Sequence, residues 1–144
     1  MKEKNLRVYP TFIAPADSMY LVFVPDMDIY TEGSTVADAI EMARDAIGLK
    51  AMDYEDDGKE LPEPSSYQKA KELAAKEADI FDYSSGILTL VDVDVDEYRK
   101  RLNNRSVKKN CTLPYWLCVQ AEREGINFSK VLQEALSEKL NVEL

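Results

Sequence analysis

The sequence predicts an α+β protein: a three- to four-stranded antiparallel sheet with helices, followed by a smaller module of one strand and two helices. Three observations predict this class. Short β-forming runs come first and lie close together, helical periodicity follows each group of strands, and the charge balance changes along the chain. Residues 1–104 carry 12 Lys or Arg against 22 Asp or Glu, whereas residues 105–144 carry 6 against 5. We therefore divide the chain into domains at 1–102 and 103–144.

The first elements are three short strands. Residues 6–14 are rich in β-forming side chains, and the Pro-Ala-Asp-Ser sequence of residues 15–18 predicts a turn. Residues 19–24 form an almost continuous apolar run, which predicts a second strand. A third strand begins at Ile29 and ends at Gly33. Two tight connections in succession favour an antiparallel meander.

Helices and one further strand complete the first domain. Ser34 or Thr35 is a suitable N-cap for a helix, and residues 56–66 hold the Gly and Pro residues of a loop before a second helix over 66–78. Residues 87–95 alternate as a half-buried strand does. Asp96 is expected to cap a short helical turn that leads into the linker. The apolar residues that keep helical spacing in the first helix are Val36, Ala39, Ile40, Ala43 and Ile47, and the valines on one side of the strand are Val91, Val93 and Val95.

The last forty residues predict one strand and two helices. Residues 106–113 alternate, and Pro114 is placed as the first residue of a helix that ends at Gly125. Asn127 is a good N-cap for the next helix. A module of this size cannot bury a core alone, so we expect it to fold as an intertwined dimer. The apolar stripe of its last helix is Phe128, Val131, Leu132, Ala135, Leu136 and Leu140.

Composition excludes several kinds of catalytic site. The chain has no histidine, two cysteines and only isolated glycines, so it lacks a Ser-His-Asp triad, a His-containing zinc site and a phosphate-binding loop. Asp92, Asp94 and Asp96 alternate along a predicted strand. They are either the polar side of that strand or ligands of a divalent cation in a nuclease. We expect the polar-side role, and with it no enzymatic activity, no cofactor and no metal.

The sequence also indicates where the protein works. No stretch approaches the about 20 apolar residues of a membrane span, and residues 1–5 do not lead into the apolar region of a signal peptide. Cys111 and Cys118 do not form the pattern of a secreted disulfide framework. We therefore expect a cytoplasmic protein. The formal net charge of the chain is −9, and the first domain is its acidic part, so this domain suits a basic protein partner.

A basic stretch meets the strand of the second domain. No acid occurs between Glu97 and Glu122, a range that holds six Lys or Arg. A strand would place Lys108, Asn110 and Thr112 on one face. Lys and Asn are suited to the edges of guanine and adenine in the major groove, although these residues could also be the polar face of a dimer ribbon.

The start of the last helix offers a second contact with DNA. Its amides after Asn127, with Ser129 and Lys130, could hold a phosphate. Helix capping alone would account for an asparagine at position 127, and it is compatible with a phosphate contact at the same place.

These residues resemble a known family. The segment from Ser106 to Leu140 resembles the ribbon-helix-helix tail of HicB antitoxins, and the first domain has the family's motifs in the same order, so the resemblance covers nearly the whole chain. In the tail the motifs are Lys108–Pro114, Trp116, Gly125–Ser129 and Leu132–Leu136, and in the first domain they are Tyr9–Pro10, Phe23–Asp26, Thr31–Thr35, Ala39, Ala43 and Asp57–Ser65.

The resemblance implies a partial ribonuclease-H-like first domain without catalytic activity. That domain would bind and mask a small, basic, mRNA-cleaving HicA toxin, and the tail would bind the operon's own operator DNA as a homodimer. Asp26, Asp28 and Glu32 are candidates for toxin contacts. Two dimers joined through their first domains would make a tetramer. The alternative is a stand-alone ribbon-helix-helix repressor without a toxin.

Overall fold

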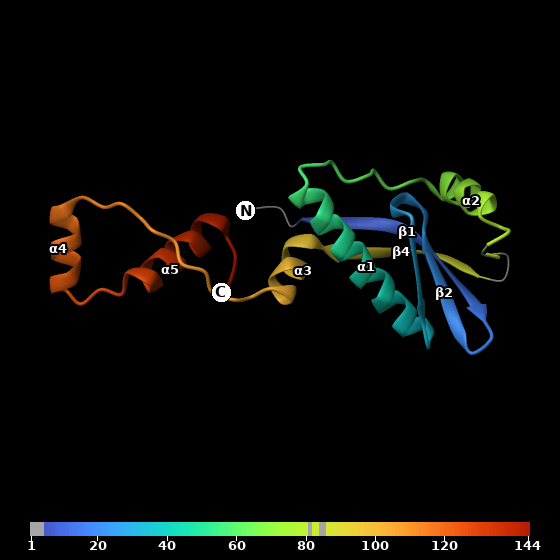
Figure 1. Cartoon of the computed structure of the whole chain (residues 1–144), viewed down its shortest axis with the longest axis horizontal. Coiled ribbons are helices and arrows are strands. Elements are labelled where there is room, and N and C mark those ends of the chain that lie inside the picture. Colours follow the sequence, from blue (N-terminus) through green and yellow to red (C-terminus); the bar gives the residue numbers. More distant parts are fainter. Residues whose placement is uncertain (1–4, 81, 84–85) are drawn as a thin grey trace. The chain divides into compact units, whose positions relative to one another are not determined.

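The structure is a computed structural model that describes residues 5–80, 82–83 and 86–144 (Figure 1). Two compact units divide the chain: one ends at Asn104, and the other runs from Arg105 to Leu144. Most of the segment in which we looked for a signal peptide, residues 1–4, lies outside the described residues. Over the described residues, no helix combines the length and the apolar character needed to cross a membrane.

The N-terminal unit is built on a four-stranded antiparallel sheet in the order β3-β2-β1-β4. The predicted meander is confirmed, and the fourth strand pairs with β1 rather than with β3. The elements in chain order are β1 (Leu6–Ala16), β2 (Met19–Val24), the 3₁₀ helix η1 (Pro25–Met27), β3 (Ile29–Gly33), α1 (Val36–Asp56), α2 (Tyr67–Lys76), β4 (Ile87–Asp94) and α3 (Val95–Leu102).

The larger core lies between the sheet and α1, which crosses the strands in Figure 1. Apart from Ile47, the core residues of α1 are alanines, whose small side chains let a helix backbone lie close to the strands. At about 25 cal/mol per Å² of apolar surface, this burial is the main stabilising contribution to the unit. The core includes Tyr9, Ile13, Val22, Val24, Val91 and Val93 from the strands, and Ala39, Ala43, Ile47 and Ala51 from α1.

A smaller core on the opposite sheet face is covered by α2. Ala70 and Ala74 pack against Phe12 and Phe23. The Tyr83 ring lies 4.8 Å from the Phe12 ring and 5.4 Å from the Phe23 ring, between centroids. These spacings are those of favourable aromatic pairs, so the rings extend the core beyond the short helix.

The first turn of α1 is closed by reciprocal hydrogen bonds. The Asp38 amide donates to the Thr35 hydroxyl over 3.0 Å, and the Ser34 amide donates to the Asp38 carboxylate over 2.8 Å. This arrangement satisfies two amides that a helix start leaves without partners. Gly33 precedes it, and a Cβ there would lie 2.4 Å from the Ala39 amide nitrogen. Only glycine therefore lets β3 turn this tightly into α1.

β4 ends one residue earlier than the alternating valines predict. The Asp94 carboxylate accepts from the Glu97 amide over 3.2 Å and caps α3. Asp96, which we expected to be the cap, lies inside the helix, because the capping oxygen is supplied by the last residue of the strand. Val95 is buried as predicted, but it is the first residue of α3 and not a strand residue.

Helix α3 is held against α1. The Tyr98 ring covers Gly48, where a Cβ would come within 2.7 Å of the ring, and the Tyr98 hydroxyl donates to the Asp45 carboxylate. Arg99 lies 2.9 Å from the Asp56 carboxylate and 3.3 Å from that of Glu55. These contacts join the last helix of the unit to the middle and the end of α1.

The Tyr98 contact predicts a loss of stability in alkali. Burial, followed by the hydrogen bond to Asp45, raises the pKa of Tyr98 to about 12, whereas an unfolded tyrosine has a pKa of about 10. Below that lower value both states keep the proton, and between the two values only the unfolded chain releases it. The free energy of unfolding must therefore fall as pH rises from about 10 to about 12.

Urea unfolding midpoints across that pH range measure the effect. Tyr98→Phe should show a shallower decline than the wild type. Some decline should remain, because burial also raises the pKa values of Tyr9 and Tyr83. Equal slopes for the two proteins would contradict the assignment to Tyr98.

The C-terminal unit contains α4 (Tyr115–Arg123) and α5 (Phe128–Leu140). Pro114 has ψ 137°, so it is the N-cap of α4 and not its first helical residue as we predicted. Gly125 follows the end of α4 with φ +67°, the left-handed conformation that favours glycine after a helix. The two predicted helices are confirmed.

Residues 106–113, predicted as a strand, form none in the single chain. A strand exists through hydrogen bonds to another strand. Nothing else in the described part of the C-terminal unit is a strand, so the segment has no strand partner among the described residues of that unit.

Candidate functional site

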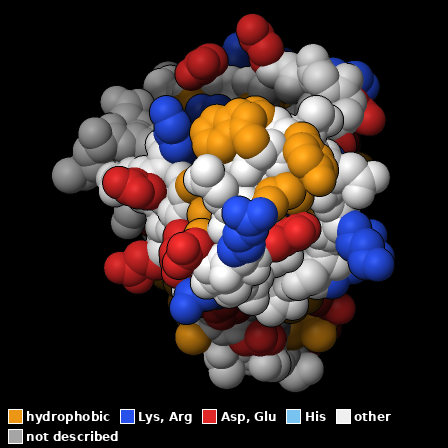
Figure 2. Space-filling view, turned by 90° about the vertical axis from the view of Figure 1, so that its left-hand side faces the viewer, with side chains coloured by type: hydrophobic (Ala, Val, Ile, Leu, Met, Phe, Trp, Pro, Cys, Tyr) orange, Lys and Arg blue, Asp and Glu red, His pale blue; other side chains and the backbone are white. Residues whose placement is uncertain are grey.

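The helices of the C-terminal unit leave their apolar side chains open to solvent. No described residue of α4 or α5 is buried. Figure 2 faces the end of Figure 1 where α4 lies and shows hydrophobic side chains gathered at the surface among charged ones. We call the large apolar residues of α5 the tail stripe: Phe128, Val131, Leu132, Leu136 and Leu140, which are 39% to 50% exposed. Contiguous exposed apolar side chains are typical of interaction surfaces.

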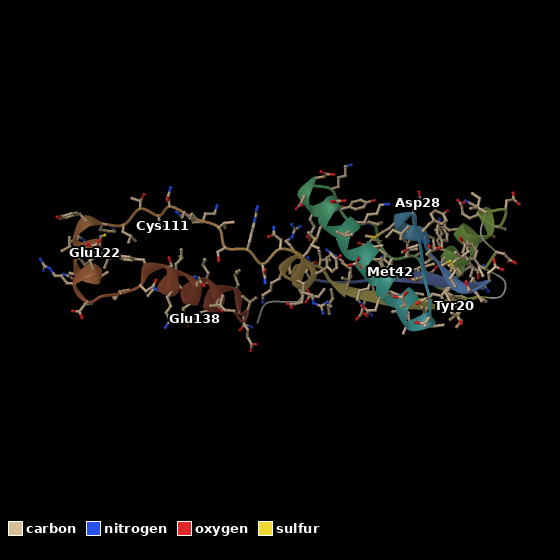
Figure 3. All side chains as sticks on the ribbon, turned by 60° about the horizontal axis from the view of Figure 1, so that its bottom comes forward. Tyr20, Asp28, Met42, Cys111, Glu122 and Glu138 are labelled. Atoms are coloured by element: carbon tan, nitrogen blue, oxygen red, sulfur yellow. The ribbon has the colours of Figure 1, made fainter. Side chains whose placement is uncertain are left out.

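The residues predicted to read DNA bases lie in the extended segment before α4. Lys108, Asn110 and Thr112 are all exposed. Cys111, on the same segment in Figure 3, and Leu113 are exposed too. In the single chain both sides of the segment are therefore open, so neither face is covered.

The residues predicted to hold a phosphate lie at the start of α5. The Asn127 side chain accepts from the Lys130 amide over 3.1 Å and caps the helix. The side chains of Ser129 and Lys130 are exposed next to it. Capping is thus the role of Asn127 in the folded chain, and the two neighbouring side chains stay open to solvent.

One of the three acids predicted to contact a toxin has an internal partner. The Asp26 carboxylate accepts from the Ser65 amide over 2.9 Å and also from the Ser65 hydroxyl. Asp28 is exposed after η1, and Glu32 is exposed on the edge strand β3. Asp26 therefore anchors the loop before α2, while Asp28 and Glu32 are open to a partner.

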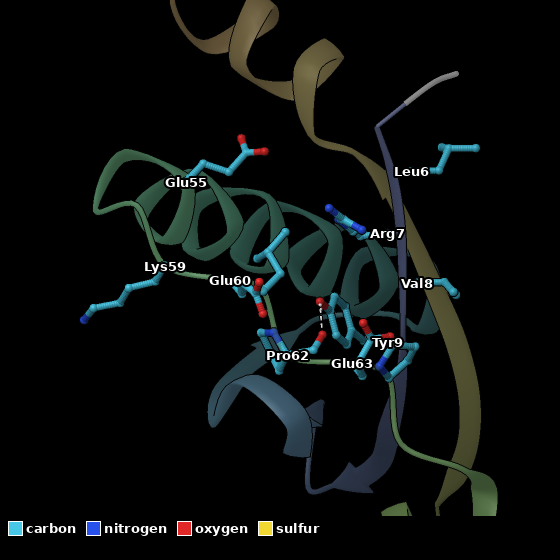
Figure 4. A pocket seen from close by; sticks show the side chains of 11 residues that line it. Leu6, Arg7, Val8, Tyr9, Glu55, Lys59, Glu60, Pro62 and Glu63 are labelled. Atoms are coloured by element: carbon cyan, nitrogen blue, oxygen red, sulfur yellow. Dashed lines mark hydrogen bonds between the residues drawn. The ribbon is translucent and has the colours of Figure 1, made fainter. Parts of the chain in front are cut away.

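A groove runs beside the first half of β1. Its volume is about 550 Å³. Figure 4 shows β1 on one side, the segment from Lys59 to Glu63 on the other, and Arg7 between them. We call this the β1 groove, and it is lined by Leu6, Arg7, Val8, Tyr9, Glu55, Lys59, Glu60, Leu61, Pro62, Glu63 and Pro64.

The outer wall of the β1 groove is held by side chains of the sheet region. The Tyr9 hydroxyl donates to the Pro62 carbonyl over 2.7 Å, and burial raises the pKa of Tyr9. The two bonds from Ser65 to Asp26 hold the end of the wall. Sequence reasoning missed this site. A proline at position 10, inside a strand, was the one signal for it, since such prolines occur at a free strand edge.

The three aspartates that might have bound a cation have separate partners. Asp92 pairs with Arg44 over 3.3 Å, Asp94 caps α3, and the Asp96 carboxylate accepts from the Asn5 side chain over 3.3 Å. They are not three neighbours on one strand face, since β4 ends at Asp94. Within the described residues, no three His, Cys, Asp or Glu side chains gather as a metal-binding group.

Comparison with known proteins assigns this fold to a class. A family model described as the HicB-like antitoxin of bacterial toxin–antitoxin systems matches residues 9–135, so the chain is of the antitoxin class. It belongs to the HicB-like antitoxin family. No curated protein matches the chain.

The chain is similar to solved structures of toxin–antitoxin proteins. A chain of a toxin–antitoxin complex from Streptococcus pneumoniae is 27% identical, with a TM-score of 0.57, over 93% of this chain and 99% of that one. The antitoxin HicB of Burkholderia pseudomallei is 26% identical, with a TM-score of 0.49, over 93% of this chain and 96% of that one.

Proposed function

We propose that this antitoxin binds and masks a small, basic HicA-type toxin through residues 1–102 and represses its own operon through residues 103–144. The match of the HicB-like family model to residues 9–135 carries the proposal. The similarity to a chain of the S. pneumoniae toxin–antitoxin complex supports a toxin as the partner. Masking is a binding function, so the chain itself needs no catalytic group.

Electrostatics support a basic partner for the N-terminal unit. This part of the chain carries most of the negative charge. Its exposed acids include Asp28 and Glu32 near β3, and Glu60 and Glu63 beside the β1 groove. Fields of one sign steer a partner of the opposite sign and raise its association rate.

The uncovered apolar side chains support a homodimer of the C-terminal unit. A second copy of the tail stripe is the surface that could bury the first. The two segments over 106–113 would then pair as an antiparallel ribbon, in which each segment gains the strand partner that it lacks alone. We expect the packing of the two tail stripes against each other to be the only hydrophobic core of this unit.

The ribbon is the proposed reader of the operator. It would place Lys108, Asn110 and Thr112 from both copies in the major groove. Lys would donate to guanine, and Asn would pair with adenine. Ser129 and Lys130, beside the start of α5, would contact a backbone phosphate. Phosphate contacts set the position on DNA, and base contacts set the sequence.

A pull-down of the tagged chain from its native locus tests the proposal. We expect a small basic protein at near-equal stoichiometry, identified by mass spectrometry, together with DNA from the chain's own operon. Recovery of the DNA without any protein partner would overturn the antitoxin role and leave a stand-alone repressor.

A further inference from the structure

The register between β1 and β4, together with one hydrogen bond, shows which way the backbone N–H and C=O groups of β1 point. β1 pairs with β4 so that Leu6 faces Asp94 and Val8 faces Asp92. The Val95 amide donates to the Asn5 carbonyl over 3.0 Å, which makes these two residues a hydrogen-bonded pair. In an antiparallel pair of strands, hydrogen-bonded residue pairs alternate with non-hydrogen-bonded ones. Leu6 and Val8 therefore belong to non-hydrogen-bonded pairs, and their N–H and C=O groups point away from β4.

Two further observations agree with this direction. Arg44 Nε donates to the Asp92 carbonyl over 2.9 Å. Asp92 faces Val8, and its carbonyl therefore points away from β1. Pro10 has the same phase as Val8 and has no N–H, which is tolerated only where the strand edge is free. The N–H groups of Leu6 and Val8 therefore point to the side of β1 opposite β4.

That side of β1 is a free strand edge. β2 first pairs with β1 at Phe12, beyond the part that contains Leu6 and Val8. Among the described residues, no backbone group of the facing wall bonds to either residue. The β1 groove lies along this edge, so the free N–H and C=O groups open into a hollow with a second wall (Figure 4).

The groove also carries charges without a charged partner. Glu60 and Glu63 line its outer wall, and Arg7 lies between that wall and β1. Within the described residues, no ion pair involves any of the three. The wall segment from Glu55 to Glu63 has five acids and one lysine. An occupant with basic side chains fits this wall.

We propose that the toxin adds an extended segment to β1 in this groove, with its backbone bonded to Leu6 and Val8. A Lys or Arg of that segment lies between the carboxylates of Glu60 and Glu63. Addition of a strand to a free sheet edge gives affinity through the backbone and specificity through the side chains. This inference rests on the proposed function, which supplies the basic partner.

The other two sheet edges fit this role less well. On β4 the outward carbonyl of Asp92 is already bonded to Arg44, and a side chain over an edge is a device that blocks pairing. β3 has only five residues. The β1 edge combines free backbone groups with a walled, acidic groove.

Paired charge reversals separate this groove from the acids near β3. The probe is the small basic protein that co-purifies with the full chain, titrated against the wild type, against Glu60→Lys with Glu63→Lys, and against Asp28→Lys with Glu32→Lys. Both double variants change the net charge equally. The anchors of the wall, Pro62 and Ser65, stay intact, and thermal melts check the fold.

We expect the Glu60 and Glu63 variant to raise the Kd by roughly tenfold or more, and the Asp28 and Glu32 variant to raise it by less than about threefold. The reverse order would overturn the groove assignment. If the wild type itself does not bind the probe, the proposed function fails, and this inference fails with it.

Amide exchange tests the strand addition directly. In the free chain the Arg7 and Tyr9 amides are bonded to β4, whereas those of Leu6 and Val8 are open. Toxin binding should slow exchange at Leu6 and Val8 by at least about tenfold. Tight binding with unchanged exchange at both residues would overturn strand addition while leaving the antitoxin role intact.

Discussion

Replacing Leu132 with Asp is expected to abolish dimer formation by the chain. Leu132 lies within the tail stripe and is 39% exposed in the single chain. A dimer would bury its exposed part, which contributes a fraction of the about 1.5–3 kcal/mol that full burial of a leucine side chain gives, and a symmetric interface contains the residue twice. An unpaired carboxylate there adds a desolvation penalty. Sedimentation measurements should find a monomer, with loss of operator binding.

The neighbouring polar residue provides the control for that variant. Gln133→Asp introduces the same carboxylate one position along α5, outside the tail stripe, and should leave the dimer intact. A dimer that survives Leu132→Asp, at the same concentration as the wild type, would show that another surface holds the two copies together.

Replacing Lys108 or Asn110 with Ala is expected to weaken operator binding by about 1–3 kcal/mol for each lost base contact. Both side chains are exposed on the segment for which we propose pairing in a dimer. Binding of the toxin should be unchanged, since the N-terminal unit is untouched. Fluorescence anisotropy with DNA from upstream of the chain's own gene measures the first effect, and titration with the toxin measures the second.

Lys139→Ala is the matched control for the Lys108 variant, because it removes the same charge from the last turn of α5. Its effect on operator binding should be small and independent of base sequence. Equal affinities for wild type, Lys108→Ala and Asn110→Ala would contradict the assignment of this segment to the major groove.

Local patterns predicted the framework of the N-terminal unit. Alternation placed Val91 and Val93 on the buried side of β4, and the Thr35 hydroxyl caps α1 as expected. These features depend on a few neighbouring residues, so they can be read from one sequence. The family resemblance, carried by short motifs over nearly the whole chain, is also confirmed.

Features that depend on distant partners were not predictable in this way. The bond between Asp26 and Ser65 joins residues 39 positions apart, so an acid that looked free proved to be a loop anchor. The β1 groove exists because β2 is shorter than β1 and the loop before α2 lies beside the remaining edge. Residues 106–113 are not a strand in the single chain, and we propose that a second copy supplies the strand partner.

The most direct test of the antitoxin role is a growth measurement in cells that produce the co-purifying basic protein alone or together with this chain. We expect the basic protein alone to arrest growth and the equimolar chain to restore it. Leu132→Asp should also restore growth, because masking uses the N-terminal unit. Continued arrest in the presence of folded, equimolar wild-type chain would contradict the proposed antitoxin role.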